Sequence, residues 1–116
     1  MDSTNREQLE LCLAVGSGYI EAEPNSTVSI ALETIGNLPL NALRRPARES
    51  SCGWYIWGGE NMLLDPELFQ PLQVSRLKGM CPEIMKYLAL APGWRVLLSK
   101  GHEDVWFDHK LLNVES

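Results

Sequence analysis

The clearest strand pattern in the chain lies between residues 27 and 32. Val28, Ile30 and Leu32 alternate there with smaller or polar residues. Because side chains of a strand point to opposite faces in turn, this period of two predicts a strand with one buried face. Similar patterns predict further strands over residues 38–44, 53–57, 94–99 and 104–108, the last two joined in a hairpin by residues 100–103.

Helical signals are present near the N-terminus. Thr4 and Glu7 have the spacing of a capping box, which predicts a helix from Asn5 to Val15 that ends near Gly16. The odd-numbered apolar residues from 9 to 15 fit a strand almost as well. We favour the helix, and the strand remains the alternative.

The best helical pattern begins at Pro82. Ile84, Tyr87, Leu88 and Ala91 follow at i, i+3, i+4 and i+7, with charged residues on the other face. Shorter helical turns are predicted after the pair Asp65-Pro66, where Asp is a good N-cap, and over residues 74–78. Residues 45–51 are polar and predict a loop. The whole pattern predicts an α+β fold: a mostly antiparallel sheet with short helices packed on one face.

Composition and charge narrow the class of protein. The chain has 116 residues, of which 45% are hydrophobic and 22% charged, as is ordinary for a globular domain. The net charge of −5 argues against a nucleic-acid binder or an anionic-membrane binder, since both need a cationic face. No apolar run approaches the roughly 20 residues that span a bilayer. The first residues carry no secretory leader, so we expect a cytoplasmic protein.

Candidate catalytic and metal-binding groups are few. The odd number of cysteines (Cys12, Cys52 and Cys81) predicts reduced, mostly buried thiols. The stretch from His102 to Asp104 could ligate a metal, but neighbouring strand residues point to opposite faces, which favours a solvated turn. A nucleophile made by Cys52 or Cys81 with His102 needs a proximity that no spacing predicts. We therefore expect no catalytic residue, no metal site and no cofactor.

The aromatic residues are more informative, because all four tryptophans fall on predicted strands. In the last strand Val105 and Phe107 share one face, which we expect to lie against the core. Trp106 then stands on the opposite face between Asp104 and Asp108. A large aromatic ring held on a strand between acids is typical of a binding anchor. The alternative is that all four tryptophans pack in a two-sided core.

The first aromatic strand raises the same question. Trp54 and Ile56 point one way, and Tyr55 and Trp57 point the other. One of these pairs is therefore either covered by a second layer or available for contact. The candidate partner-binding residues are Trp106, Asp104, Asp108, Glu103, Trp57 and Glu60. The arginines Arg44, Arg45 and Arg48 read as a solvated loop, or alternatively as a partner for these acids or a grip on phosphate.

Several short motifs resemble a known family. They are Leu43–Pro46, Cys52–Glu60 with its Gly-Trp-Tyr-Ile-Trp-Gly-Gly run, Cys81–Ile84 and Pro92–Leu98. Together they are similar to the thirty-third of the numbered immunity-protein families of bacterial polymorphic toxin systems. The resemblance covers about residues 40–112. Cys52 stands where relatives often have Ser or Thr before the Gly-Trp pair.

The resemblance implies a single immunity-protein-like domain over residues 1–116. Such a protein is cytoplasmic and non-catalytic, needs no cofactor, and binds and neutralises a cognate toxin whose identity the sequence does not give. Many toxins are basic enzymes, and a net charge of −5 would speed association with one. The alternatives are a generic operon-encoded interaction domain and, less favoured, a small enzyme that uses Cys81 or His102.

Overall fold

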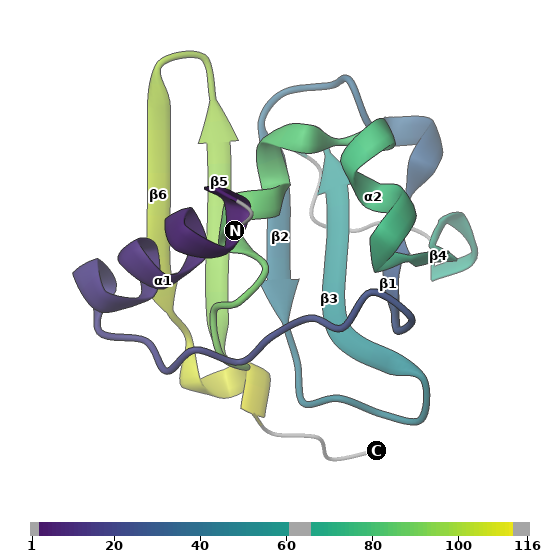
Figure 1. Cartoon of the computed structure of the whole chain (residues 1–116). Helices are drawn as coiled ribbons and strands as arrows, with labels where there is room; N and C mark the ends of the chain where they lie inside the picture. The colour runs from purple at the N-terminus through teal and green to yellow at the C-terminus, as the bar shows by residue number, and fades with distance from the viewer. Residues whose placement is uncertain (1–2, 61–65, 113–116) are drawn as a thin grey trace.

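The computed structural model describes residues 3–60 and 66–112, which form one six-stranded sheet with a layer of helices (Figure 1). The strand order is β4-β1-β3-β2-β5-β6, and every neighbouring pair is antiparallel except β1 with β3. The strands are β1 (Thr27–Ile30), β2 (Leu40–Arg44), β3 (Ser51–Gly58), β4 (Gln70–Gln73), β5 (Trp94–Ser99) and β6 (His102–Phe107). The predicted α+β class and the mostly antiparallel sheet are confirmed.

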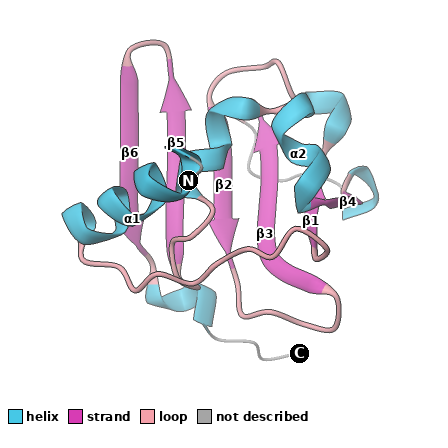
Figure 2. Cartoon of the chain, in the orientation of Figure 1, coloured by secondary structure: helices cyan, strands magenta, loops and turns pink. Residues whose placement is uncertain are grey.

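Helices cover one face of this sheet. Helices α1 (Ser3–Val15) and α2 (Val74–Met80) lie on the same side of it (Figures 1 and 2), and the 3-10 helix η3 (Pro82–Tyr87) packs against both. Further 3-10 turns are η1 (Leu32–Thr34), η2 (Pro66–Leu68) and η4 (His109–Leu112). We call the covered side the helix face and the other side the open face.

The main core fills the space between the sheet and the helices. On β3 the even-numbered residues point to the helix face, so Trp54 and Ile56 are fully buried there. Leu77 from α2, and Ile84 and Leu88 from η3 and its end, close over them. At about 1.5–3 kcal/mol for each fully buried large apolar side chain, this cluster is the main source of stability.

Helix α1 presents one stripe of residues to this core. Gln8 and Cys12 are buried, one turn apart, whereas Leu9 and Leu13 point outward. The Gln8 amide donates a hydrogen bond to the Met85 carbonyl, 2.8 Å away, which fixes α1 on η3. The predicted N-terminal helix is confirmed, and the alternative strand is wrong.

The long helix predicted from Pro82 is wrong beyond its first turns. The structure has a 3-10 helix that ends at Tyr87, and the N–H groups of Leu88 and Leu90 donate to the carbonyls of Met85 and Tyr87, three residues back rather than four. The Ala89 carbonyl accepts from Ile20 N at 2.8 Å, and the Leu88 and Leu90 carbonyls accept from a side chain described below. Tertiary hydrogen bonds thus hold the segment that the periodicity placed in the helix.

Other boundaries also differ from the prediction. The first strand ends at Ile30, and Leu32 begins η1. The C-terminal hairpin turns over two residues rather than four, since His102 already pairs with Ser99. Strand β4 was not predicted. Its Pro71 is tolerated because β4 lies at the edge of the sheet. The predicted cap at residue 65 lies outside the described residues.

Arg44 is the main surprise of the core, because the sequence placed it in a solvated basic loop. Its side chain is 2% exposed and points to the helix face. Nε donates to the Cys52 carbonyl at 3.0 Å, and Nη1 donates to the carbonyls of Ile20 (2.7 Å), Leu88 (3.1 Å) and Leu90 (2.7 Å). One buried guanidinium therefore links three parts of the fold by hydrogen bonds: the segment after α1, the segment after η3, and the sheet.

A glycine is needed where the Cys-Gly-Trp motif passes this side chain. Gly53 has φ +99°, a conformation that other residues rarely adopt. A Cβ on Gly53 would also overlap the carbonyl oxygen of Arg45. The two residues are close because the Arg45 N–H donates a hydrogen bond to the Gly53 carbonyl at 2.8 Å. The backbone conformation and the close contact therefore explain why the Cys-Gly-Trp motif has a glycine at its centre.

Candidate partner-binding face

The open face is uncovered at the β5–β6 end of the sheet. The register pairs Arg95 with Trp106 and Leu97 with Asp104, so these four side chains form two neighbouring rows on that face. None of the four is buried. The predicted strand faces are thus confirmed: Trp106 and Asp104 point away from the helix layer.

The other end of the open face is covered by a small second cluster. Leu43 and Trp57 are buried there with Leu111 from η4, and Phe69 packs edge-on to the Trp57 ring at 6.2 Å. Trp57 is only 4% exposed. In this conformation its ring supports the sheet and offers no contact surface, contrary to its predicted role.

Trp106 is held in place by its cross-strand neighbour. Its side chain is 39% exposed, and the Arg95 guanidinium lies 5.4 Å from the centroid of its ring. A cation over an indole ring contributes roughly 0.5–1 kcal/mol at exposed sites. The ring therefore has one face against Arg95 while part of it remains in contact with water.

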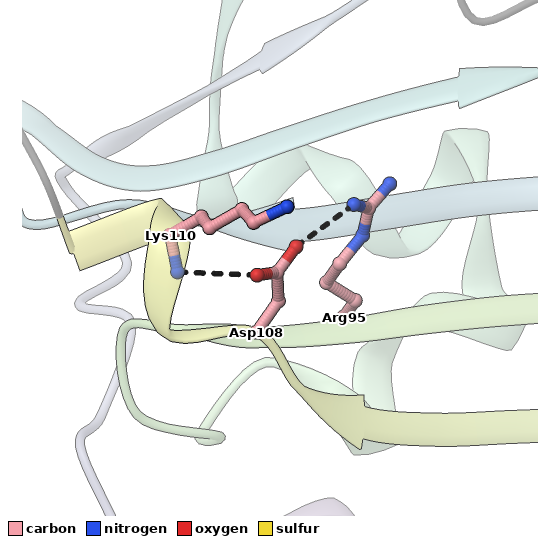
Figure 3. A network of polar contacts seen from close by, with 3 residues as sticks. All are labelled: Arg95, Asp108 and Lys110. Atoms are coloured by element: carbon pink, nitrogen blue, oxygen red, sulfur yellow. Dashed lines mark hydrogen bonds and ion pairs between the residues drawn. The ribbon is translucent and has the colours of Figure 1, made fainter.

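Asp108 in turn holds Arg95 (Figure 3). Asp108 Oδ2 lies 3.2 Å from Arg95 Nη1, and Oδ1 accepts a hydrogen bond from the backbone N–H of Lys110 at 3.1 Å. The Lys110 N–H, followed by Arg95, lowers the pKa of Asp108 below its ordinary value. The carboxylate is therefore charged at neutral pH and restricts how the guanidinium under Trp106 can move.

Asp104 lies on the same face with a weaker local partner. Its Oδ2 is 2.9 Å from His102 Nε2, and both side chains are more than half exposed. Exposed ion pairs of this kind contribute little to stability, so Asp104 can exchange partners at low cost.

Within residues 3–60 and 66–112, no three His, Cys, Asp or Glu side chains are placed to hold a metal ion.

Glu103 and Glu60 do not join this group. Glu103 points to the helix face, where its carboxylate accepts a hydrogen bond from the Tyr87 hydroxyl and lies 3.7 Å from Lys86 Nζ. Burial, followed by Glu103, raises the pKa of Tyr87. Glu60 is exposed beyond the end of β3. Two strands separate β3 from β6, so Glu60 is offset sideways by roughly 14 Å from β6.

Phe107 departs from its predicted place in the core. It points to the helix face but remains 47% exposed, and its ring packs edge-on to Trp94 at 5.6 Å. Gly93 allows this contact, because a Cβ at that position would overlap the Phe107 ring. Val105, two residues before Phe107 on the same face, is the β6 hydrophobic residue that packs against the main core.

The three cysteines are free and buried, as predicted. Burial is the largest cause that raises the pKa of Cys81 to about 11, and burial also raises the pKa of Cys12. Reactive cysteines are instead exposed thiols with a lowered pKa. His102 lies in the exposed hairpin, whereas Cys81 is 1% exposed at the start of η3.

A second apolar surface lies on the outer side of α1. Leu9, Leu13 and Tyr19 are exposed there, and Leu9 and Tyr19 line a shallow groove with Asn5 and Arg6. This surface was not predicted from the sequence, although the i, i+4 spacing of Leu9 and Leu13 is a signal for it. The described helices include none that is long and apolar enough to cross a membrane.

Comparison with known proteins gives one match. The sequence profile of the Imm33-like domain matches residues 7–108, which is most of the chain and includes every strand. The match also takes in α1, which the motif resemblance did not reach. No curated protein and no solved structure gave a significant match.

Proposed function

The chain belongs to the Imm33-like domain family of immunity proteins, and on this premise we propose that it binds and neutralises a cognate toxin. It acts by occupying the toxin surface and not by catalysis, it needs no cofactor, and it works in the cytoplasm of the cell that makes it. The toxin's chemistry is outside this proposal, because the family implies only that a toxin partner exists.

One observation supports the binding site above all others: the partly exposed Trp106 ring fixed on Arg95. Energetically dominant interface residues are enriched in Trp, Tyr and Arg, and here a Trp and an Arg stand side by side on adjacent strands. Because Asp108 holds Arg95, little side-chain freedom is left to lose on binding. Residues Leu97 and Asp104 extend the contact toward the hairpin turn.

Charge supports a basic partner surface. The chain carries a net charge of −5, and Asp104, two residues from Trp106 on the same face, keeps more than half of its side chain exposed, whereas Asp108 is paired with Arg95. Complementary charge raises the rate of encounter more than it raises affinity. A basic toxin would therefore be captured quickly and then held by Trp106.

The direct test is a growth-rescue experiment. The toxin encoded beside this chain is expressed in bacteria from an inducible promoter, with and without this chain. We expect growth arrest with the toxin alone and normal growth when this chain is also made. Persistent arrest in cells that contain the folded protein would overturn the proposed function.

A further inference from the structure

Strand β6 is an uncovered edge of the sheet. It is last in the strand order, and Figure 1 shows no strand beyond it. It is six residues long and contains no proline, and five of its six residues are exposed. The opposite edge, β4, has only four residues and is interrupted by Pro71. Natural proteins usually blunt edges as β4 does, so the long regular edge of β6 calls for an explanation.

Two observations show which backbone groups of β6 face outward. His102 pairs with Ser99 across a two-residue turn, and the Asp108 N–H donates to the Gly93 carbonyl at 2.7 Å. Both place the even-numbered N–H groups toward β5. Since the direction alternates along a strand, the N–H and C=O groups of Glu103, Val105 and Phe107 point away from the sheet.

We propose that β6 receives an extended, positively charged segment of the toxin as a seventh strand. This inference rests on the proposed function and adds the mode of binding. Main-chain hydrogen bonds to residues 103, 105 and 107 would give affinity, and side chains on alternate positions would give specificity. The added strand would lie beside Trp106 on the open face and beside Phe107 on the helix face.

The charges along β6 identify the occupant as basic. Asp104 on the open face and Glu103 on the helix face stand at adjacent positions, and beside their local partners His102 and Lys86 their side chains remain 53% and 46% exposed. A strand with Lys or Arg on both faces would meet an acid on each. A second copy that paired antiparallel through the same outward groups would be centred on Val105 and would place Glu103 opposite Phe107 and Asp104 opposite Trp106, so neither acid would meet a cation.

Hydrogen exchange of the complex tests this proposal. The probe is the toxin identified by growth rescue, inactivated by substitution of a catalytic residue. We expect the amides of Glu103, Val105 and Phe107 to exchange at least about tenfold more slowly in the complex, since each gains a hydrogen bond. The amides of Asp104 and Trp106 are already bonded to β5 and should change much less. Docking through side chains alone would not give this alternation.

A backbone variant provides a second test. Val105→Pro removes one outward N–H without removing a bond to β5, and an edge strand tolerates such a proline. We expect a loss of affinity of about tenfold or more, because the opposing carbonyl is left without a donor. Val105→Ala is the matched control, since it trims the same core contact and keeps the N–H. Circular dichroism checks that both variants fold.

The outcomes separate the two proposals. Tight binding with no protection at residues 103, 105 and 107 would overturn strand addition and leave the proposed function intact. Equal affinities of the two Val105 variants would do the same. A toxin that neither binds nor is neutralised would remove both. Protection of these amides in the free protein, together with a dimeric mass by light scattering, would show that a second copy takes the edge and would overturn the basic strand.

Discussion

Arg44 offers the sharpest test of how the fold is held together. Arg44→Met keeps much of the length of the side chain but removes the guanidinium and its four hydrogen bonds to main-chain carbonyls. Burial lowers the pKa of Arg44, and the described residues include no carboxylate paired with it. The carbonyls therefore take the place of a counter-ion.

The expected magnitude follows from these contacts. After the substitution Leu88 O still accepts from Trp54 Nε1 at 2.9 Å, but the carbonyls of Ile20, Cys52 and Leu90 lose this donor. Each hydrogen bond to a charged group contributes about 1.5–3 kcal/mol, and relief of the buried charge offsets part of the loss. We expect a net destabilisation of about 3–5 kcal/mol, because each of the three buried carbonyls left without this donor costs about 1–3 kcal/mol.

Urea denaturation followed by tryptophan fluorescence measures this change. For a chain of this length about 1 kcal/mol corresponds to roughly 4 °C, so the melting temperature should fall by about 12–20 °C. The matched control is Arg45→Met, one residue along but with an exposed side chain, which should change stability by less than about 0.5 kcal/mol. A loss below about 1 kcal/mol for Arg44→Met would show that the guanidinium does not hold these segments together.

Three further predictions concern charge, packing and pH. Asp104→Lys should slow toxin association and flatten the dependence of the association rate on salt, measured by stopped flow. Glu33→Lys makes the same charge change at η1, away from the binding face, and should have a smaller effect. Equal effects of the two variants would show that the position of the charge does not matter. Leu88→Ala should lower the free energy of unfolding by about 2–5 kcal/mol, because the side chain is fully buried, and a change under about 1 kcal/mol would contradict its place in the core. The raised pKa of Cys81, about 11 against an ordinary 9.0, means that the folded state keeps a proton that the unfolded state releases, so stability should fall as pH rises from 9 to 11. Cys81→Ala should weaken that dependence in denaturation curves at pH 8 and 10.5, and an unchanged pH dependence would count against the shift.

The features that sequence reasoning captured depend on short-range patterns. The face of Trp106 follows from its neighbours Val105 and Phe107, because alternation along a strand is fixed by backbone geometry. The hairpin and the existence of the N-terminal helix also follow from local signals, although the predicted cap is wrong, because α1 begins at Ser3 and Thr4 lies inside it. These features define the candidate face before any tertiary contact is considered.

The features that sequence reasoning missed depend on contacts between segments that are distant in the chain. Trp57 looked as available as Trp106, but residues 68, 69 and 111 fold over it from other parts of the sequence. Arg44 stands next to a second arginine and looked solvated, yet three of its four partner carbonyls are 24 to 46 residues away. The helix from Pro82 ends early, and the carbonyls of Leu88 and Leu90 just after it are held by the Arg44 side chain, which is distant in the chain.

The affinity of the Trp106→Ala variant for the inactivated toxin tests the binding site most directly. Isothermal titration should show a loss of about 2 kcal/mol or more, which is roughly 30-fold in Kd, while the loss of the Arg95 contact lowers the melting temperature by only about 2–4 °C. Leu13→Ala, which trims the exposed surface of α1 instead, should bind as the unmodified chain does. Wild-type affinity for Trp106→Ala together with weakened binding for Leu13→Ala would contradict the proposed site and move it to α1.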